Sequence, residues 1–231
     1  MPPVTYVVGD IHGCPDLYRT LEEHIERDAK GDPVLVILVG DLIDRGPDSA
    51  AVISHLMGTA PEGLQRLPLM GNHEEMFVEF LDAPRTNIRW LEHGGLETLG
   101  SYGVRDEHLA EFDLPEAELS EHFHALIPND HYAWVRNLPS AVHPGAQYFI
   151  SHSGINPKKL LWEQTAHDLR WTRRMEFPPP IGITVVHGHT PIETVETDQR
   201  YINVDTGAYG SGLLSALRII PGKPPTAIEV S

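Results

Sequence analysis

The chain has 231 residues, 41% of them hydrophobic, which is enough for one large domain or two small ones around a sizeable core. Its net charge of −16, from 17 basic and 33 acidic residues, disfavours nucleic acid as a partner. The longest aliphatic run, Val34–Val39, is too short to cross a membrane. Cys14 is the only cysteine and the N-terminus lacks a secretory leader, so we expect a reducing cytoplasm and no membrane partner.

Five short apolar runs, most of them rich in β-branched residues, predict buried strands. They lie at residues 4–8, 34–39, 67–70, 147–150 and 183–186. Near-continuous hydrophobic strands suit sheets that are covered on both faces. The stretch from 201 to 230 alternates apolar and polar residues between glycines, which predicts antiparallel strands near the end of the chain.

Two segments with helical periodicity separate the first three runs. In residues 16–31, Asp16 is the expected N-cap and Gly31 the expected end, and Glu22 falls on a face that reads as exposed. Residues 48–58 predict a second helix. The alternation of strand and helix predicts a layered α/β fold.

Residues 81–145 differ from the rest of the chain, because they are polar, rich in histidine and glutamate, and mostly helical by pattern. We interpret them as a helical insertion or cap within a single domain that spans residues 1–231.

Polar residues of metal-binding type follow each predicted strand. The motifs are GDIHG at 9–13, GDLIDRG at 40–46, GNHE at 71–74, HSG at 152–154 and HGHT at 187–190. Taken singly, each also fits a capping aspartate, a solvated turn or a structural histidine. Because loops at the carboxyl ends of strands converge on one crevice, their common position favours a metal site. Carboxylate, imidazole and amide ligands without sulfur suit Mn²⁺, Fe²⁺ or Zn²⁺.

In this order, the five motifs resemble those of the PPP serine/threonine phosphatases among the calcineurin-like metallophosphoesterases, of the bacterial and bacteriophage-lambda type. The resemblance extends from Gly9 to Gly207, since YINVDTGA at 201–208 also resembles the stretch that closes those enzymes. It implies two mixed β-sheets packed as a sandwich and flanked by helices, in four αββα layers. It also implies a phosphoric-ester hydrolase with two divalent metal ions, with Mn²⁺ first and Fe, Zn or Ni as alternatives.

The resemblance also implies which residues bind the metals. Asp41 is shared between the two ions, and His189 is favoured over His187 because it directly precedes Thr190. The implied ligands are Asp10, His12, Asp41, Asn72, His152 and His189.

The chemistry implied by the resemblance is a direct displacement. A hydroxide held between the two ions attacks phosphorus in line, and His73 protonates the leaving group. Asp44 orients the imidazole of His73, and Arg45 binds the phosphate. Arg173 is the expected second phosphate-binding arginine, with Arg174 as the alternative.

Three functions remain open on this reading. The first is a phosphatase of phosphorylated proteins, specific for serine and threonine or of dual specificity. The second is a hydrolase of dinucleoside tetraphosphates or other small phosphoesters. The third is an inactive scaffold, which the complete set of expected ligands disfavours. Glu74 and Glu75 read as solvated or structural residues, and the oligomeric state is not predicted.

Overall fold

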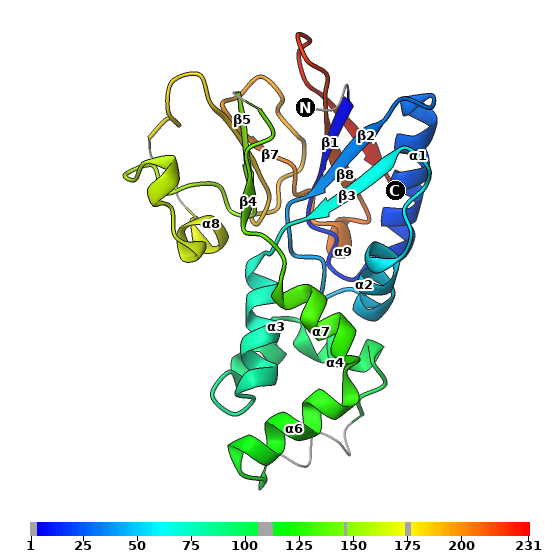
Figure 1. The fold of residues 1–231 in the computed structure, drawn as a ribbon, viewed down its shortest axis with the longest axis vertical. Helices are drawn as coiled ribbons and strands as arrows, with labels where there is room; N and C mark the ends of the chain where they lie inside the picture. The colour runs from blue at the N-terminus through cyan, green and yellow to red at the C-terminus, as the bar shows by residue number, and fades with distance from the viewer. Residues whose placement is uncertain (1–3, 106–112, 146, 174–176) are drawn as a thin grey trace.

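The computed structural model describes residues 4–105, 113–145, 147–173 and 177–231 (Figure 1). Nine strands form two mixed sheets within this part of the chain. The larger sheet has the order β3-β2-β1-β8-β9, in which β1 to β3 run parallel and β8 and β9 antiparallel. Its strands are β1 (Val4–Val8), β2 (Val34–Leu38), β3 (Leu64–Pro68), β8 (Leu214–Ile219) and β9 (Thr226–Val230).

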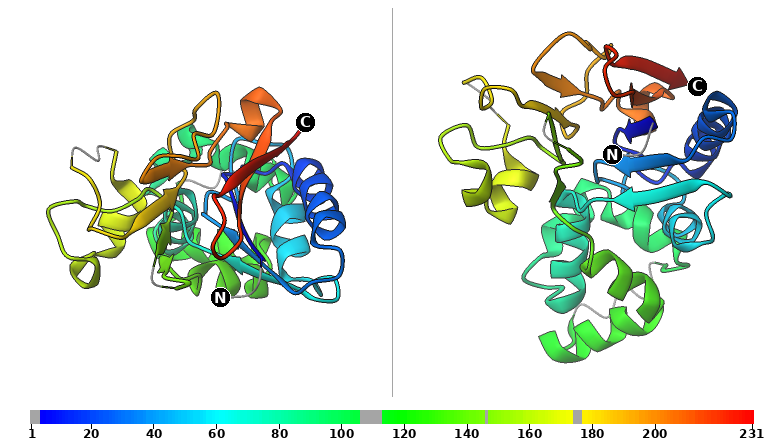
Figure 2. Two further views of the ribbon diagram at one scale, coloured as in Figure 1. Left: turned by 90° about the horizontal axis from the view of Figure 1, so that it is seen from above. Right: turned by 45° about the horizontal axis from the view of Figure 1, so that its top comes forward.

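The smaller sheet has the order β4-β5-β6-β7, with β5, β6 and β7 parallel. Its strands are β4 (Ala141–Val142), β5 (Tyr148–Ser151), β6 (Thr184–His187) and β7 (Tyr201–Asn203). Helices α1 (Pro15–Ala29) and α2 (Ser49–Met57) cover the outer face of the larger sheet, and α8 (Ala166–Trp171) covers the smaller one (Figures 1 and 2). The predicted αββα layering is therefore confirmed.

The alternation of side chains along the strands explains the layers. Tyr6 and Val8 of β1 point to the core beneath α1 and α2, whereas Val7 points to the core between the two sheets. That middle core also contains Ile150 and Val186 from the smaller sheet. Because the central strands β1 and β2 bury both faces, their sequences have to be hydrophobic almost throughout, as the first two apolar runs are.

Two expectations about the strands are wrong in detail. β3 begins at Leu64, three residues before the predicted run at 67–70, because polar Arg66 lies inside the strand and is paired rather than solvated. β7 does not join the antiparallel C-terminal strands; it lies parallel to β6 in the other sheet.

The ends of the first helix also differ from expectation. α1 begins at Pro15, which is suited to a first turn since it needs no amide donor there, and Cys14 occupies the cap position. Asp16 lies in the first turn and pairs with Arg19 instead of capping. The helix ends at Ala29, two residues before the expected Gly31, and Lys30 is the C-cap residue in left-handed backbone.

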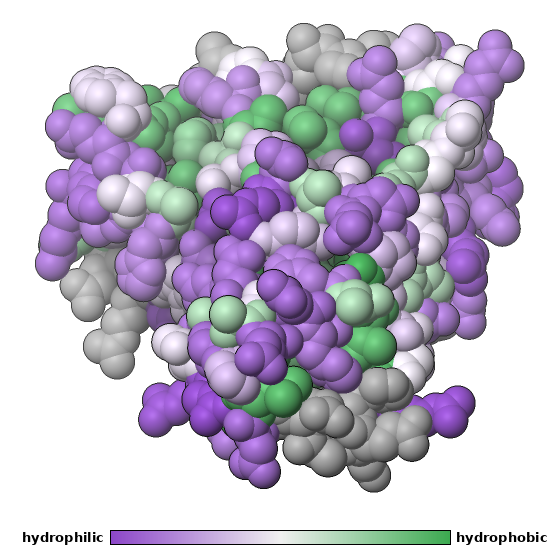
Figure 3. Space-filling model, turned by 60° about the horizontal axis from the view of Figure 1, so that its bottom comes forward, coloured by the Kyte–Doolittle hydropathy of each residue, from purple (hydrophilic) through white to green (hydrophobic). Residues whose placement is uncertain are grey.

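A group of helices lies beyond the carboxyl ends of β1, β2 and β3, at the lower end of Figure 1. It consists of α3 (Asn72–Asp82), η1 (Ile88–His93), α4 (Gly95–Ser101), α6 (Glu116–Leu126) and α7 (Asn129–Arg136). The face at this end is mostly hydrophilic (Figure 3). The remaining short elements are η3 (Leu161–Glu163) and α9 (Ala208–Ser211). In the described part of the chain, no helix has the length and apolar character needed to span a bilayer.

Glu22 is buried rather than exposed, contrary to expectation. Its carboxylate accepts two hydrogen bonds from Arg66 of β3, at 2.7 Å each, and contacts His55 Nε2 of α2 at 2.8 Å. Tyr18 donates a fourth hydrogen bond from its hydroxyl group. This buried ion pair joins α1, α2 and the edge strand β3.

We expect Glu22→Gln to lower the free energy of unfolding at pH 7 by about 3 kcal/mol, because it leaves the buried Arg66 charge uncompensated. Burial raises the pKa of Glu22, but the hydrogen bonds from Arg66 and His55 lower it by a larger amount, so the net shift of the pKa is downward. The stabilisation is therefore present above the unfolded pKa of about 4.3 and is lost as pH falls through the lowered value. Urea unfolding at several pH values measures it. The exposed Glu23→Gln serves as control and should change stability by less than about 0.5 kcal/mol.

Candidate metal centre

The loops that follow the strands hold an unusual backbone conformation. Five of the six non-glycine residues with positive φ in the described chain come from the predicted motifs. They are His12 (45°), Asp41 (48°), Asp44 (73°), Arg45 (67°) and His189 (75°). This region costs an L-residue roughly 1–2 kcal/mol, and such strain clusters where side chains must be aimed for function.

One carboxylate holds the loop after β2 in this conformation. Oε2 of Glu74 accepts hydrogen bonds from the backbone amides of Asp41 and Gly71, at 2.9 and 2.8 Å. Oε1 accepts from Leu42 and Ile43, at 2.7 and 3.3 Å. Glu74 is fully buried, so of the two roles left open for it, solvated or structural, it has the structural one.

Two glycines are required by close approach of the backbone to carboxylates. A Cβ on Gly71 would lie 2.2 Å from Asp41 Oδ1, and one on Gly188 would lie 2.0 Å from Asp10 Oδ1. Both distances are far inside van der Waals contact, so a side chain at either position would displace the carboxylate.

Four side chains from distant parts of the chain point at a common centre. Asn72 Oδ1 lies 2.8 Å from both His152 Nε2 and His189 Nδ1, which are 3.1 Å apart. Asp41 Oδ1 lies 3.2 Å from His152 Nε2. Adjacent ligands about 2.1 Å from one cation are separated by about 3 Å when they subtend a right angle. These four atoms therefore fit the ligand set of a single divalent ion.

A second group adjoins the first through Asp41. His12 donates from Nδ1 to the carbonyl of Ile43 at 2.8 Å, which leaves Nε2 with a lone pair, 3.6 Å from Asp41 Oδ2. Oδ2 of Asp10 accepts a hydrogen bond from the backbone amide of His189 at 3.0 Å. The buried Oδ1 of Asp10 has no hydrogen-bond partner among the described residues. Ligand atoms of His12 and Asp41, together with His73, lie within 4.8 Å of one another.

The electrostatics of the site favour bound cations. Burial lowers the pKa of His12 and of His189 to about 3, so both imidazoles are neutral and free to coordinate. Burial, Asp205 and Asp41 together raise the pKa of Asp10, and burial raises that of Asp205 to about 6. The buried carboxylates of Asp10, Asp41 and Asp205 repel one another, and divalent cations bound between them would stabilise all three.

His73 and Asp44 form the predicted imidazole–carboxylate pair. His73 Nδ1 lies 2.6 Å from Asp44 Oδ2, which also accepts from Trp90 Nε1 at 2.7 Å. Thr98 donates to Asp44 Oδ1 at 2.6 Å. Trp90 and Thr98 come from η1 and α4, and no local signal in the sequence identifies them as part of the site.

Arg45 lies between the two groups. Its Nη1 and Nη2 contact Nε2 of His12 and of His73, both at 3.0 Å, and its guanidinium lies 5.0 Å from the ring centroid of Tyr209. Because arginine has only donors, both imidazole Nε2 atoms are acceptors in this arrangement. Tyr209 is a further site residue that the motifs do not reveal.

A cavity of about 200 Å³ opens onto these groups. It is lined by Asp41, Arg45, Asn72, His73, Arg173, His189, Thr190, Pro191 and Tyr209. Arg173 thus reaches the same cavity as Arg45, whereas Arg174 lies outside the described residues. His187 hydrogen-bonds through Nδ1 to the carbonyl of Gly188 and is not part of either ligand group.

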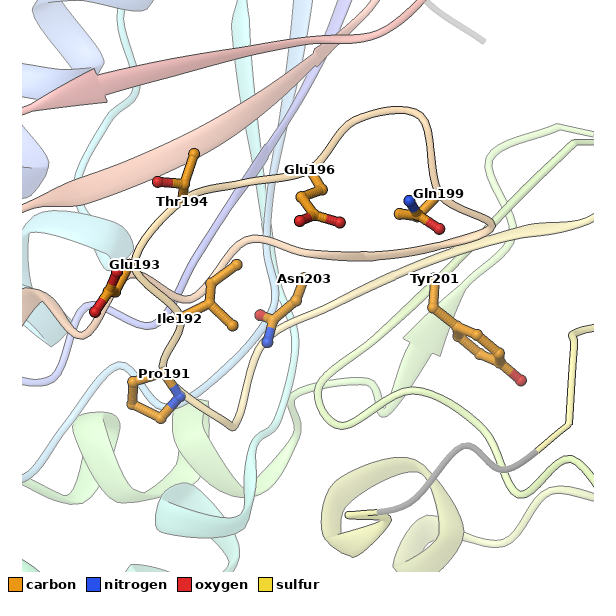
Figure 4. A pocket seen from close by; sticks show the side chains of 8 residues that line it. All are labelled: Pro191, Ile192, Glu193, Thr194, Glu196, Gln199, Tyr201 and Asn203. Atoms are coloured by element: carbon orange, nitrogen blue, oxygen red, sulfur yellow. The ribbon is translucent and has the colours of Figure 1, made fainter.

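Two larger cavities adjoin this one at Pro191, which lines all three. The larger of these two, about 640 Å³, is formed by the loop between β6 and β7 and by β7 itself, and it carries the carboxylates of Glu193 and Glu196 (Figure 4). The other, about 480 Å³, is mostly apolar and includes Tyr209 and Leu213. A ligand longer than the small cavity would therefore meet Glu193, which lines both of the larger ones.

Comparison with known proteins identifies the family. The model of the calcineurin-like phosphoesterases matches residues 4–212, nearly the whole chain, so the chain belongs to this family. It is a metal-dependent phosphoric-ester hydrolase of the PPP phosphatase type, as the motifs indicate.

Curated relatives have two different activities. The chain is 30% identical to serine/threonine-protein phosphatase 2 of Escherichia coli, over 93% of this chain and 92% of that protein. It is 27% identical to serine/threonine-protein phosphatase 1 of Salmonella typhimurium, covering 93% and 91%. It is also 28% identical to the asymmetrical bis(5'-nucleosyl)-tetraphosphatase PrpE of Bacillus subtilis, covering 92% and 89%.

Solved structures confirm the fold. A proposed diadenosine tetraphosphatase superposes with a TM-score of 0.66 and 20% identity, covering all of this chain and 95% of the other. A cold-active protein-tyrosine phosphatase of a Shewanella species superposes with a TM-score of 0.62 and 17% identity, covering 100% and 81%.

We expect Asp41→Asn to lower the metal content from about two ions per chain to less than one, because Asp41 belongs to both ligand groups. Elemental analysis after dialysis against a metal-free buffer measures this content. Asp16→Asn, which removes the same charge from an exposed helix turn, should retain both ions. Equal metal content in the two variants would contradict a shared carboxylate.

Proposed function

We propose that this chain is a protein phosphatase that removes phosphate from phosphoserine and phosphothreonine residues. The observation that carries the proposal is one cavity lined by members of both metal-ligand groups, by the imidazole of the His73–Asp44 pair and by two arginines. Similarity to the two enterobacterial phosphatases along the whole chain supports it. We further propose manganese as the metal and the reducing cytoplasm as the compartment, with residues 1–231 acting as one domain.

In this proposal Asp41 would serve as a ligand to both of two divalent cations. The assigned ligands are Asp10, His12 and Asp41 for the first cation, and Asp41, Asn72, His152 and His189 for the second. When bound, the cations withdraw electron density from phosphoryl oxygens and lower the pKa of water from about 15.7 toward about 7.

The arginines bind and orient the substrate phosphate. Arg45 now donates to two imidazole nitrogens, and phosphate oxygens are stronger acceptors for a planar guanidinium that can bind two of them at once. Arg173 lies at the same cavity and supplies a second positive charge. Together they make the cavity attractive to a phosphate group within an acidic protein.

His73 delivers the proton that the leaving alkoxide needs. Burial and Arg45 lower the pKa of His73, but Asp41 and Asp44 raise it, and the net shift is upward. Once Arg45 turns to the phosphate, Nε2 of His73 is free to take up a proton and pass it to the leaving oxygen. Asp44 keeps Nδ1 protonated and the ring oriented, while Trp90 and Thr98 fix Asp44 itself.

Dinucleoside tetraphosphate hydrolysis is the second candidate, because the PrpE relatives match along the whole chain. The charge around the cavity argues against it. A dinucleoside polyphosphate carries several negative charges beyond the cleaved bond, and the neighbouring cavity presents Glu193 and Glu196 to them. A phosphopeptide carries one phosphate group and can place neutral or basic residues there.

We expect kcat/KM for a phosphothreonine peptide to exceed that for diadenosine tetraphosphate by at least about tenfold, equivalent to about 1.4 kcal/mol. Neutralising the cavity with Glu193→Gln and Glu196→Gln should raise kcat/KM for the dinucleotide but not for an uncharged phosphopeptide. Steady-state assays on both substrates measure this. A wild-type preference for the dinucleotide would instead assign the chain to the second activity.

We expect His73→Asn to lower kcat by roughly 10²–10⁴ on phosphoserine peptides, which have poor leaving groups. The decrease should be much smaller on p-nitrophenyl phosphate, because nitrophenolate leaves without protonation. The variant should retain its metals, which elemental analysis verifies. An equal decrease on both substrates would count against His73 as the proton donor.

A further inference from the structure

The carboxylate of Glu75 joins α3 to the end of α8. Its Oε1 lies 2.6 Å from Arg170 Nη1, and its Oε2 accepts from Trp171 Nε1 at 2.5 Å. Arg170 also donates from Nη2 to Ser140 at 2.7 Å. The side chains of Glu75 and Arg170 are 23% and 11% exposed, so this contact is protected from solvent.

The opposite side of the same segment is held through Ser153, which follows His152 in the chain. The amide of Ser153 donates to the carbonyl of Leu169 at 2.8 Å, and its hydroxyl accepts from the amide of Thr172 at 2.9 Å. Residues 169–172 are therefore fixed between α3 and the loop after β5.

Arg173 follows directly and reaches the catalytic cavity. It is exposed, and no hydrogen bond or ion pair to it is present among the described residues. Its guanidinium lies close enough to His189 to lower the pKa of that imidazole, although burial is the largest cause. A long, unpaired side chain keeps its freedom of rotation, so the position of its backbone determines where the charge can go.

We propose that Glu75 is a positioning residue that sets the location of Arg173 over the substrate phosphate, an inference that rests on the proposed phosphatase function. The carboxylate of Glu75 fixes Arg170 and Trp171. Because Arg173 is only two residues beyond Trp171, the Cα atoms of these two residues are at most about 7.6 Å apart. Arg170 therefore does not bind the phosphate; it serves to hold the segment that carries Arg173.

Glu75 belongs to the same helix as two other residues of the site. The first turn of α3 supplies Asn72, His73 and Glu75. One helix therefore fixes a metal-ligand candidate, the proton donor and, through Glu75, the second arginine relative to one another.

The test is a double-mutant cycle on Mn²⁺-loaded enzyme with Glu75→Ala, Arg173→Ala and both together. We expect Glu75→Ala to raise KM for p-nitrophenyl phosphate and the dissociation constant for inorganic phosphate by roughly ten- to a hundredfold. Turnover at saturation should change less. In the Arg173→Ala background, the same substitution should have almost no effect on phosphate affinity. Isothermal titration calorimetry measures the phosphate affinity directly.

Glu79→Ala is the matched control, because Glu79 lies one turn further along α3, carries the same charge and is exposed. It should leave phosphate affinity within about twofold of wild type. Trp171→Phe is a second test variant that removes only the indole donor, and it should weaken phosphate binding in the same direction as Glu75→Ala.

Unchanged phosphate affinity in Glu75→Ala, or an effect that is fully additive with Arg173→Ala, would overturn the inference. If Glu75→Ala does not fold, Trp171→Phe decides, and wild-type affinity in that variant would overturn it as well. A wild-type enzyme that hydrolyses no phosphate ester would instead refute the proposed function.

Discussion

The hydrogen bonds that Glu74 accepts from the loop after β2 are the interaction on which the site depends. Asp41 must sit in left-handed backbone at the end of a buried strand, and three successive amides of the loop donate to the Glu74 carboxylate and hold it there. Glu74 belongs to α3, which also begins with Asn72 and His73. The same contact therefore fixes Asp41, the proposed shared metal ligand, relative to Asn72 and to His73, the proposed proton donor.

The two sheets bring the remaining candidate ligands to that point. The larger sheet delivers Asp10 and Asp41 from the ends of β1 and β2, and the smaller sheet delivers His152 and His189 from the ends of β5 and β6. The apolar core between the sheets locks their relative position. Because close-packed interiors resist deformation, ligand geometry is set by the fold rather than by the bound ion alone.

The sequence predicts the residues that converge at the site better than it predicts the residues that hold them in position. Each candidate ligand lies next to a hydrophobic strand in a short contiguous motif, so the strand ends predict that these residues converge, and the resemblance of the motifs implies which of them are ligands. The supporting residues act across long separations in the chain. Trp90 reaches Asp44 from 46 positions away, and Trp171 reaches Glu75 from 96. Glu22 looks like part of a solvated face because its partner Arg66 lies on a strand 44 residues later. Pairing of this kind depends on tertiary structure, which local periodicity does not encode.

The most direct test of the central claim is a crystal structure of the Mn²⁺-loaded protein with anomalous scattering recorded at the manganese edge. The account predicts two peaks about 3.5–4 Å apart on either side of the Asp41 carboxylate, one near His12 and the other near His152. A single peak, or peaks that are not bridged by Asp41, would contradict the account.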